Sequence, residues 1–189
     1  MKKILLLAVF AMSALEPLRA QTTFPALLAQ GPAPQHREKL MLFGQFVGDW
    51  DFQGIEYHAD GTKPTDKGEI SFRWVLGGRA VQDVWIEYGR SDAQTKTHGT
   101  TVRFYDPAID AWQVTWSDPP TGSVQGMVGR RVGDEIVMEG KRPNGTAIRW
   151  IFSQIQPNSF HWRGEELMGK SWRVTEELSA QRRANAVPR

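Results

Sequence analysis

Residues 112–122 read Trp-Gln-Val-Thr-Trp-Ser-Asp-Pro-Pro-Thr-Gly. Apolar and polar side chains alternate over residues 112–117, which predicts a β-strand with one apolar face. The residues that follow, 118–122, are those most often found in tight turns. A short turn joins antiparallel strands. This stretch therefore predicts a strand that is hairpin-linked to its neighbour.

The same alternation extends through the chain from residue 48 onward, with turn signals at roughly 8–12-residue spacing, which is typical of an all-β domain. Short connections occur at residues 76–79 and at Asn144-Gly145, a strong hairpin signal. Consecutive antiparallel strands avoid exposed edges by closing on themselves. We therefore predict a single antiparallel up-and-down barrel of about ten strands. Such a barrel is wide enough for a cavity, since about eight strands can already hold a small ligand.

One helix is predicted, over residues 34–46. Leu40, Phe43 and Val47 recur at spacings of three and four, with Leu42 and Phe46 as a second apolar edge. Proline is common at the first helical position and glycine is common just after the end. Pro34 and Gly48 occupy these two places. We expect this helix to cap one end of the barrel with its apolar face.

The N-terminus has the features of a secretory signal peptide. Lys2 and Lys3 precede an apolar run over residues 4–15, and a polar exit ends at the small residue Ala20. The alternative is an uncleaved anchor, but the run is shorter than the about 20 apolar residues of a spanning helix. We predict a signal peptide at residues 1–20 and a secreted or periplasmic protein. A flexible leader (21–34), the barrel domain (35–180) and a loose tail (181–189) follow.

Composition excludes several classes of protein. The chain contains no cysteine, which rules out disulfides, thiolate metal sites and cysteine nucleophiles. Removal of residues 1–20 takes away three basic and one acidic residue, which leaves 20 of each. A neutral mature chain without a basic stripe argues against a nucleic-acid partner. No membrane span is predicted in the mature chain.

Gly48-Asp49-Trp50, placed directly after the helix and at the start of the first strand, resembles the signature of calycins, which include lipocalins and fatty-acid-binding-type barrels. Further matching stretches are residues 36–50, Leu76-Gly77-Gly78-Arg79, Phe104-Tyr105-Asp106-Pro107, Trp116-Ser117-Asp118 and the strands over residues 140–177. In this order they resemble a bacterial secreted family with a lipocalin-like domain of unknown function, over nearly the whole mature chain. The haem-binding nitrobindin barrels are more distantly similar; only Gly48, Trp50 and Gly54 align with their motif.

A small hydrophobic or aromatic ligand in the barrel lumen is the leading functional hypothesis, because ligand pockets combine apolar walls with a few polar groups. The candidate ligand-binding residues are Trp112, Trp116, Trp150, Gln82, Arg149 and His161. Two alternatives remain for their positions: the tryptophans form a filled core, and Arg149 lies on the outer face.

Two other functions compete with ligand binding. His161 lies between Phe160 and Trp162, and a neutral imidazole can ligate haem iron, so one alternative is a haem-binding or isomerase-like barrel enzyme. The other is a structural or partner-binding module. No catalytic triad, phosphate loop or metal-ligand spacing is present in the sequence.

The sequence also predicts which residues pack together where the barrel closes. In calycins a basic side chain near the chain end packs across the indole of the Gly-x-Trp motif, and the resemblance assigns this role to Arg173. We therefore expect the Arg173 guanidinium within about 6 Å of the Trp50 ring, with Gly48 and Trp50 as structural residues.

Overall fold

The structure is a computed structural model that describes residues 27–88 and 95–184. The predicted signal peptide, residues 21–26 of the predicted leader and the last five residues of the tail lie outside this range. The described part contains the helix α2 (Arg37–Gly44), a short 3₁₀ turn η1 (Leu76–Gly78) and the strands β1 (Gly48–Glu56), β2 (Thr65–Val75), β3 (Ala80–Tyr88), β4 (Thr95–Asp106), β5 (Ala111–Asp118), β6 (Ser123–Val132), β7 (Glu135–Lys141), β8 (Ala147–Gln156), β9 (Ser159–Met168) and β10 (Ser171–Arg182). None of its helices is long and apolar enough to cross a membrane.

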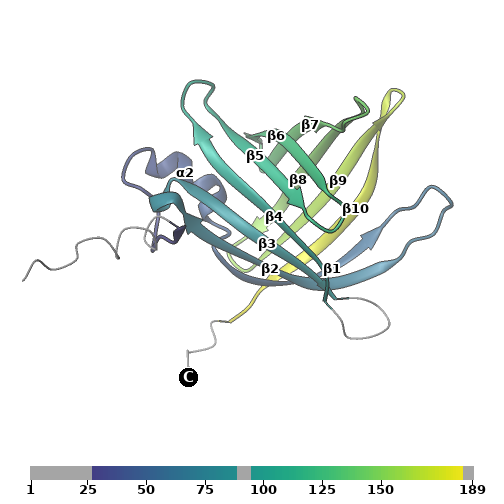
Figure 1. Cartoon of the computed structure of the whole chain (residues 1–189), viewed down its shortest axis with the longest axis horizontal. Coiled ribbons are helices and arrows are strands. Elements are labelled where there is room, and N and C mark those ends of the chain that lie inside the picture. The colour runs from purple at the N-terminus through teal and green to yellow at the C-terminus, as the bar shows by residue number, and fades with distance from the viewer. Residues whose placement is uncertain (1–26, 89–94, 185–189) are drawn as a thin grey trace, which may run out of the picture.

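The ten strands form a closed antiparallel barrel in which each strand pairs with its neighbours in sequence, and β1 pairs with β10 (Figure 1). This confirms the predicted all-β, up-and-down barrel. The closing register places Trp50 opposite Arg182 and Glu56 opposite Glu176. Because closure pairs both edges, the barrel exposes no unpaired strand edge to other chains.

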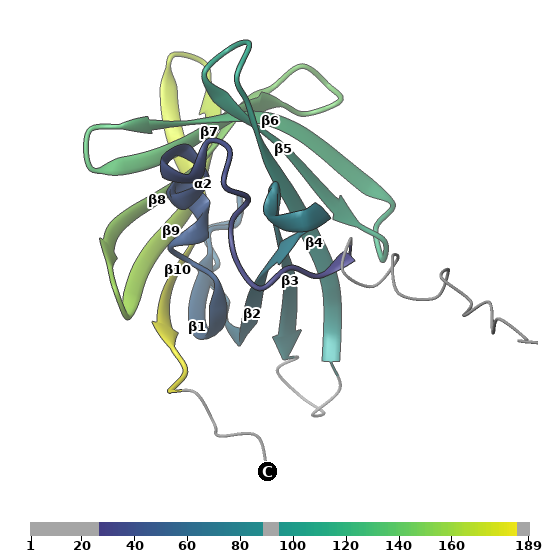
Figure 2. The same cartoon turned by 90° about the vertical axis from the view of Figure 1, so that its left-hand side faces the viewer.

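Helix α2 covers one end of the barrel, as predicted (Figure 2). It begins at Arg37 rather than Pro34, because His36 before it has a left-handed backbone with φ of 58°. Leu40 and Phe43 are buried beneath the helix. The helix is only eight residues long, too short to be stable alone, so its packing against the barrel holds it in place.

The helix-covered end, which we call the closed end, is filled with aromatic rings. The Phe46 ring lies 4.7 Å from that of Phe152 and 5.1 Å from that of Phe160, between ring centroids. The Trp50 ring lies 4.7 Å from that of Phe160. Tilted and edge-to-face aromatic pairs add to the stability gained by burying their surface. The closed end is therefore the solid core of the molecule.

The chain segments flanking the barrel differ from the prediction. In the expected leader, Ala29 N–H donates to Trp74 O at 3.0 Å and Ala33 N–H donates to Gly78 O at 2.9 Å. Gly78 has φ of +79°, and a Cβ there would lie 2.2 Å from the carbonyl oxygen of Gly31. Only glycine accommodates that backbone and that approach, so residues 29–33 pack against the barrel.

The final strand also runs further than expected. It includes Gln181 and Arg182, which the sequence assigned to the loose tail. The cause is closure: Asp51 and Trp50 of β1 lie opposite these two residues, and their backbone groups find partners only if β10 continues.

Candidate functional site

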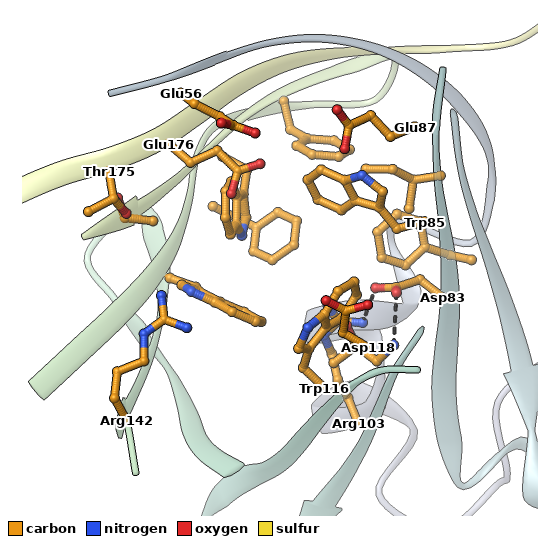
Figure 3. A pocket seen from close by; sticks show the side chains of 18 residues that line it. Glu56, Asp83, Trp85, Glu87, Arg103, Trp116, Asp118, Arg142, Thr175 and Glu176 are labelled. Carbon is orange, nitrogen blue, oxygen red and sulfur yellow. Dashed lines mark hydrogen bonds and ion pairs between the residues drawn. The ribbon is translucent and has the colours of Figure 1, made fainter. Parts of the chain in front are cut away.

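A cavity of ≈ 310 Å³ occupies the barrel lumen next to the closed-end core. It extends toward the opposite end, which we call the mouth, where β1, β3 and β5 end. Its size falls at the lower limit of small-molecule sites. The lining combines seven aromatic rings (Phe72, Trp85, Trp116, Trp150, Phe152, Phe160 and Trp162) with seven charged side chains (Glu56, Asp83, Glu87, Arg103, Asp118, Arg142 and Glu176) (Figure 3).

Four indoles form a closed ring around the lumen, which we call the tryptophan belt: Trp85 of β3, Trp116 of β5, Trp150 of β8 and Trp162 of β9. Their centroids lie 6.3 Å apart for Trp85–Trp116 and 6.0 Å for Trp116–Trp150. The ring closes through separations of 5.7 Å for Trp150–Trp162 and 5.8 Å for Trp85–Trp162. All four contacts are edge-to-face, the arrangement that aromatic quadrupoles favour.

A buried ion pair lies between the belt and the closed end. Arg103 Nη1 donates to Asp83 Oδ2 at 2.5 Å, and both side chains are less than 5% exposed. The Thr101 N–H donates to Asp83 Oδ1 at 3.0 Å. The guanidinium carbon lies 5.2 Å from the Phe43 ring centroid, within cation–π range. Arg103 Nε is buried without a hydrogen-bond partner among the described residues, so one donor at the cavity wall is unsatisfied.

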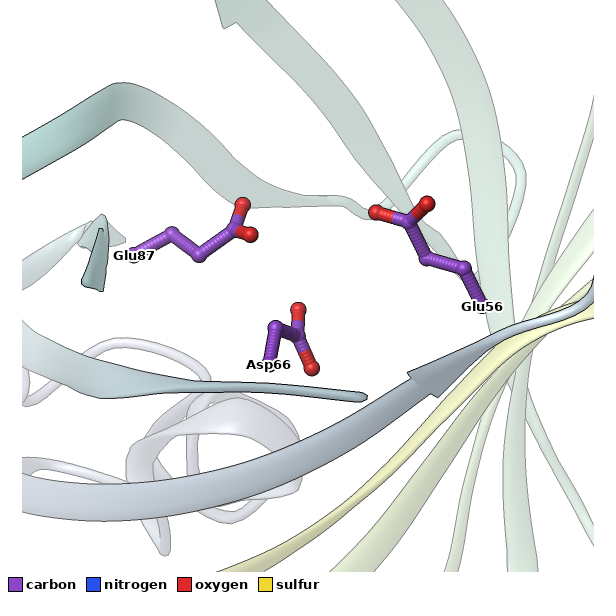
Figure 4. Close-up of side chains that lie close together, drawn as sticks. All are labelled: Glu56, Asp66 and Glu87. Atoms are coloured by element: carbon purple, nitrogen blue, oxygen red, sulfur yellow. The ribbon is translucent and has the colours of Figure 1, made fainter. Parts of the chain in front are cut away.

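The mouth carries a cluster of carboxylates, the acidic rim: Glu56, Asp66, Glu87, Asp118 and Glu176. Carboxylate oxygens of Glu56, Asp66 and Glu87 lie within 4.8 Å of one another (Figure 4). They come from three neighbouring strands, because β2 pairs with both β1 and β3. Three carboxylate oxygens at this spacing could ligate a hard cation such as Ca²⁺.

Glu176 has the most perturbed environment of the rim. Burial, together with the charges of Asp66, Glu56 and Glu87, raises the pKa of Glu176 to about 8, while Arg142 acts to lower it. Arg142 itself pairs with Glu166 at 2.8 Å. At neutral pH the rim therefore holds one carboxyl group mainly in its protonated form, because its neighbours already carry negative charge.

Of the predicted ligand-binding tryptophans, two line the cavity and one does not. Trp116 and Trp150 belong to the belt. Trp112 lies in the closed-end core, 2% exposed and 4.9 Å from the Phe43 ring between centroids. The core alternative considered for these tryptophans therefore holds for Trp112, since helix α2 packs directly on it.

The predicted polar residues of the lumen, Gln82, Arg149 and His161, lie on the outer face. This corrects the expected placement of Gln82 and His161 and agrees with the outer-face alternative for Arg149. Their chain neighbours Asp83, Trp150 and Trp162 face the lumen, and side chains alternate along a strand. On the outside, Gln82 Nε2 donates to Thr100 Oγ1 at 2.9 Å.

Arg149 and His161 also have partners on the outer face. The Arg149 guanidinium carbon lies 4.3 Å from the Trp172 ring centroid, and its Nε donates to Glu165. Burial acts to raise the pKa of Glu165, but hydrogen bonds from Arg163 and Arg149 outweigh it and hold that pKa below its usual range. His161 Nε2 lies 3.2 Å from Glu177 Oε2.

The cation over Trp50 is Arg182, not Arg173. The Arg182 guanidinium carbon lies 4.1 Å from the indole centroid. Its Nη1 donates to Val47 O at 2.7 Å and its Nη2 to Gln45 O at 2.8 Å. Arg173 instead donates to His58 O at 3.0 Å, near the mouth. The expected cation–π contact with Trp50 is present, but the closing register places Arg182, nine residues after Arg173, over the ring.

Several lumen residues escaped the sequence analysis: Trp85, Trp162, the Asp83–Arg103 pair and the acidic rim. One signal could have found part of the set. In β3, Asp83, Trp85 and Glu87 occupy successive same-face positions, and β5 repeats the tryptophan-to-acid step with Trp116 and Asp118. Two strands of one sheet with the same order of ring and carboxylate indicate a shared layer inside the barrel.

The cavity does not fit the haem hypothesis. Haem iron takes its axial ligand from histidine, cysteine, methionine or tyrosine, and the described residues that line the cavity include none of these. His161, the proposed ligand, lies outside the lumen.

A second hollow of ≈ 790 Å³ runs along the outside of α2. Its lining includes the exposed pair Lys39 and Asp110, 2.6 Å apart, and the hydroxyl of Tyr105, which donates to Asp110 at 2.6 Å. This groove is larger than the lumen cavity but lies open on the surface. The lumen, lined by seven aromatic rings, is the better candidate for a ligand site.

No known protein family and no curated protein matches the sequence. Two solved structures share its fold. The crystal structure of Rv2717c from M. tuberculosis aligns with a TM-score of 0.58 and 13% sequence identity, over 81% of this chain and 99% of that chain. The S-type phycobiliprotein lyase CPES from Guillardia theta aligns with a TM-score of 0.54 and 10% identity, over 77% and 93% of the two chains. At these identities the likeness concerns the fold: this chain and both structures share one barrel architecture.

Proposed function

We propose that the protein binds a small, largely apolar or aromatic molecule in its lumen. The observation that carries this proposal is the ≈ 310 Å³ cavity ringed by the tryptophan belt. Trp85, Trp116 and Trp150 point inward yet remain only partly buried. Inward aromatic rings are fully buried where other side chains cover them, as at the closed end, so these indoles border open space that a ligand can fill.

The buried Arg103 supplies the polar contact that such a site needs. Its guanidinium is held by Asp83 and by the phenyl rings beneath it, while Nε has no hydrogen-bond partner among the described residues. An unsatisfied buried donor costs about 1–3 kcal/mol. A carbonyl, ether or hydroxyl oxygen on the inner end of the ligand would satisfy this donor and fix the orientation of the ligand.

Binding can be tested with the neutral fluorophore N-phenyl-1-naphthylamine. We expect saturable energy transfer from the belt tryptophans to the probe at micromolar concentration. The variant Gly164→Leu places a side chain in the cavity, because Gly164 lines it and its Cβ would lie 3.2 Å from the Trp162 ring. This variant should weaken binding at least tenfold.

The matched control is Gly126→Leu, where a Cβ meets nothing within 4 Å. This variant should bind within about twofold of the native chain. Equal binding by the native chain and the Gly164→Leu variant, with both folded by circular dichroism, would exclude the lumen as the site.

The proposal includes export of the protein. It rests on Lys2, Lys3 and the apolar run at residues 4–15, which are typical of a signal peptide. Mass spectrometry of the protein expressed in a bacterial host should find a mature chain that begins near Gln21 in the periplasm or medium. A chain that retains Met1 in the cytoplasm would contradict it.

A further inference from the structure

The charges of the lumen are unevenly distributed. Five acidic side chains and two arginines line the cavity. The Arg103 charge is matched by Asp83, and Arg142 is paired with Glu166 just outside the cavity. Among the described lining residues, Glu56, Glu87, Asp118 and Glu176 lie on the mouth side, where Glu56 also lies 2.7 Å from His58. The inner side holds the Asp83–Arg103 pair and aromatic rings.

The aromatic and acidic layers lie one above the other. Trp85 and Glu87 occupy consecutive same-face positions of β3, and Trp116 and Asp118 do so in β5. Two residues along a strand correspond to about 7 Å. Figure 3 shows the carboxylates of Glu56, Glu87 and Glu176 gathered at one side of the cavity, with the Trp85 indole next to them.

Tryptophan is the side chain with the strongest attraction for cations, through the negative face of its ring. Groups of such rings recognise quaternary ammonium ligands. Carboxylates about 7 Å beyond the rings add long-range attraction for the same charge. An anionic ligand would meet repulsion at the mouth, and a neutral one would gain nothing from the rim.

We propose that the lumen ligand is an organic cation, with an apolar or aromatic body within the tryptophan belt and an ammonium group toward the acidic rim. This inference rests on the proposed lumen-binding function and names its ligand class. Selectivity for the cation comes from the rim, whereas affinity for the body comes from the belt.

Binding of a cation should depend on pH. Glu176 lies among the rim carboxylates, opposite Glu56 in the closing register, and its pKa is raised to about 8. The charged groups that face it are Glu56 of β1, Asp66 of β2, Glu87 of β3 and Arg142, which precedes β8. A cation with a fixed charge should bind more tightly as pH rises from 6 to 9, because the rim gains a negative charge in this interval. Binding at pH 7 should release a proton.

The test compares three probes with one ring system and different charge: trimethyl(1-naphthylmethyl)ammonium, 1-naphthalenemethanol and 1-naphthoate. Titration calorimetry with the full chain should show the ammonium compound binding at least tenfold more tightly than the alcohol at pH 8, and the carboxylate most weakly. The heat of binding measured in buffers of different ionisation enthalpy should reveal the released proton.

Variants separate the rim from the belt. Glu87→Gln and Glu176→Gln should each reduce the preference for the ammonium probe over the alcohol by about three- to tenfold, and leave binding of the alcohol within twofold. Glu139→Gln removes a charge from the exposed face of β7 and should leave the preference unchanged.

The outcomes distinguish failure of the cation inference from failure of the proposed lumen binding. If no probe binds, the proposed lumen function fails. If the alcohol or the carboxylate binds as tightly as the ammonium probe, and the Gly164→Leu variant binds neither, the lumen function stands and the cation inference is wrong. The inference is also wrong if the ammonium probe binds equally well with and without saturating Ca²⁺ at the rim, because its charge then does not lie at the rim.

Discussion

The closed end and the mouth of the barrel are built from the same strands, yet they are opposite in character. Trp50 and Glu56 lie six residues apart on the inner face of β1, and Trp112 and Asp118 do so in β5. That distance is about 20 Å along a strand. Over it, the lumen changes from a core of interlocked rings to a partly open cavity lined with carboxylates.

This difference shows how one alternating pattern can serve both stability and binding. Rings at the closed end contact one another and the helix, so their burial stabilises the fold. Rings of the belt leave a cavity, so they contribute less to stability and are available to a ligand. Substitutions at the two ends should therefore have separable effects, and four changes test that separation.

The largest effect is expected at the closed end, from Trp50→Ala. Trp50 is 1% exposed, its Nε1 donates to Phe46 O at 2.7 Å and its ring contacts Phe160. Loss of such a buried aromatic side chain should cost about 3–5 kcal/mol of unfolding free energy, measurable by urea denaturation. Trp172→Ala, on the outer face, is the control and should cost about 1 kcal/mol or less. Similar losses in both variants would remove the distinction between core and surface tryptophans.

The next effect tests the border between the two ends. Asp83→Asn removes the charge that balances Arg103 while retaining an acceptor for the Thr101 N–H. Breaking one partner of a buried ion pair leaves an uncompensated charge, and we expect a loss of about 3 kcal/mol. The matched change Asp51→Asn, in the exposed pair with Arg183, should cost under about 1 kcal/mol. A small loss at Asp83 would mean that the cavity hydrates Arg103.

Arg182→Gln probes how the closed end is sealed. It removes the cation over Trp50 and the hydrogen bonds to Val47 O and Gln45 O. A hydrogen bond from a charged group contributes up to about 1.5–3 kcal/mol. We expect the variant to lose about 2 kcal/mol of unfolding free energy, measured by thermal unfolding. Arg173→Gln, at the mouth end of the same strand, should be nearly neutral. The reverse order would restore Arg173 as the closing residue.

The last change concerns the mouth and pH. The pKa of Glu176 is raised to about 8 from its ordinary value of 4.5, so the folded state holds this proton more tightly than the unfolded chain. The stabilisation is complete below about pH 4.5 and is lost as pH rises through 8. Glu176→Gln should therefore be more stable than the native chain at pH 9, and the gain should vanish at pH 4.5. Equal stability at pH 9 would mean that Glu176 titrates normally.

The sequence predicted much of the fold because alternation and turn residues are local signals. Ten strands, the helix over the barrel end and the inward positions of Trp116 and Trp150 follow from residues close together in the chain. The same rule also shows why Arg149 and His161 could not share the lumen with Trp150 and Trp162: adjacent strand residues point to opposite faces.

The candidate site was less predictable because it depends on register. Four of the five carboxylates of the acidic rim, Glu56, Asp66, Glu87 and Glu176, come together from strands at both ends of the chain. A shift in the β9–β10 register between Val174 and Glu176 interrupts strict alternation, and a single-sequence pattern does not reveal it.

The sequence by itself therefore determined that this chain forms a closed all-β barrel with an aromatic inner face, because hydrophobic periodicity and turn chemistry act over a few residues. Only the tertiary structure decided that Arg182 rather than Arg173 covers Trp50, that Trp112 belongs to the core, and that four carboxylates converge at the mouth. Each of these depends on how far strands slide past one another as the barrel closes. That offset is set by the joint packing of the whole core, and no short segment of the chain contains it.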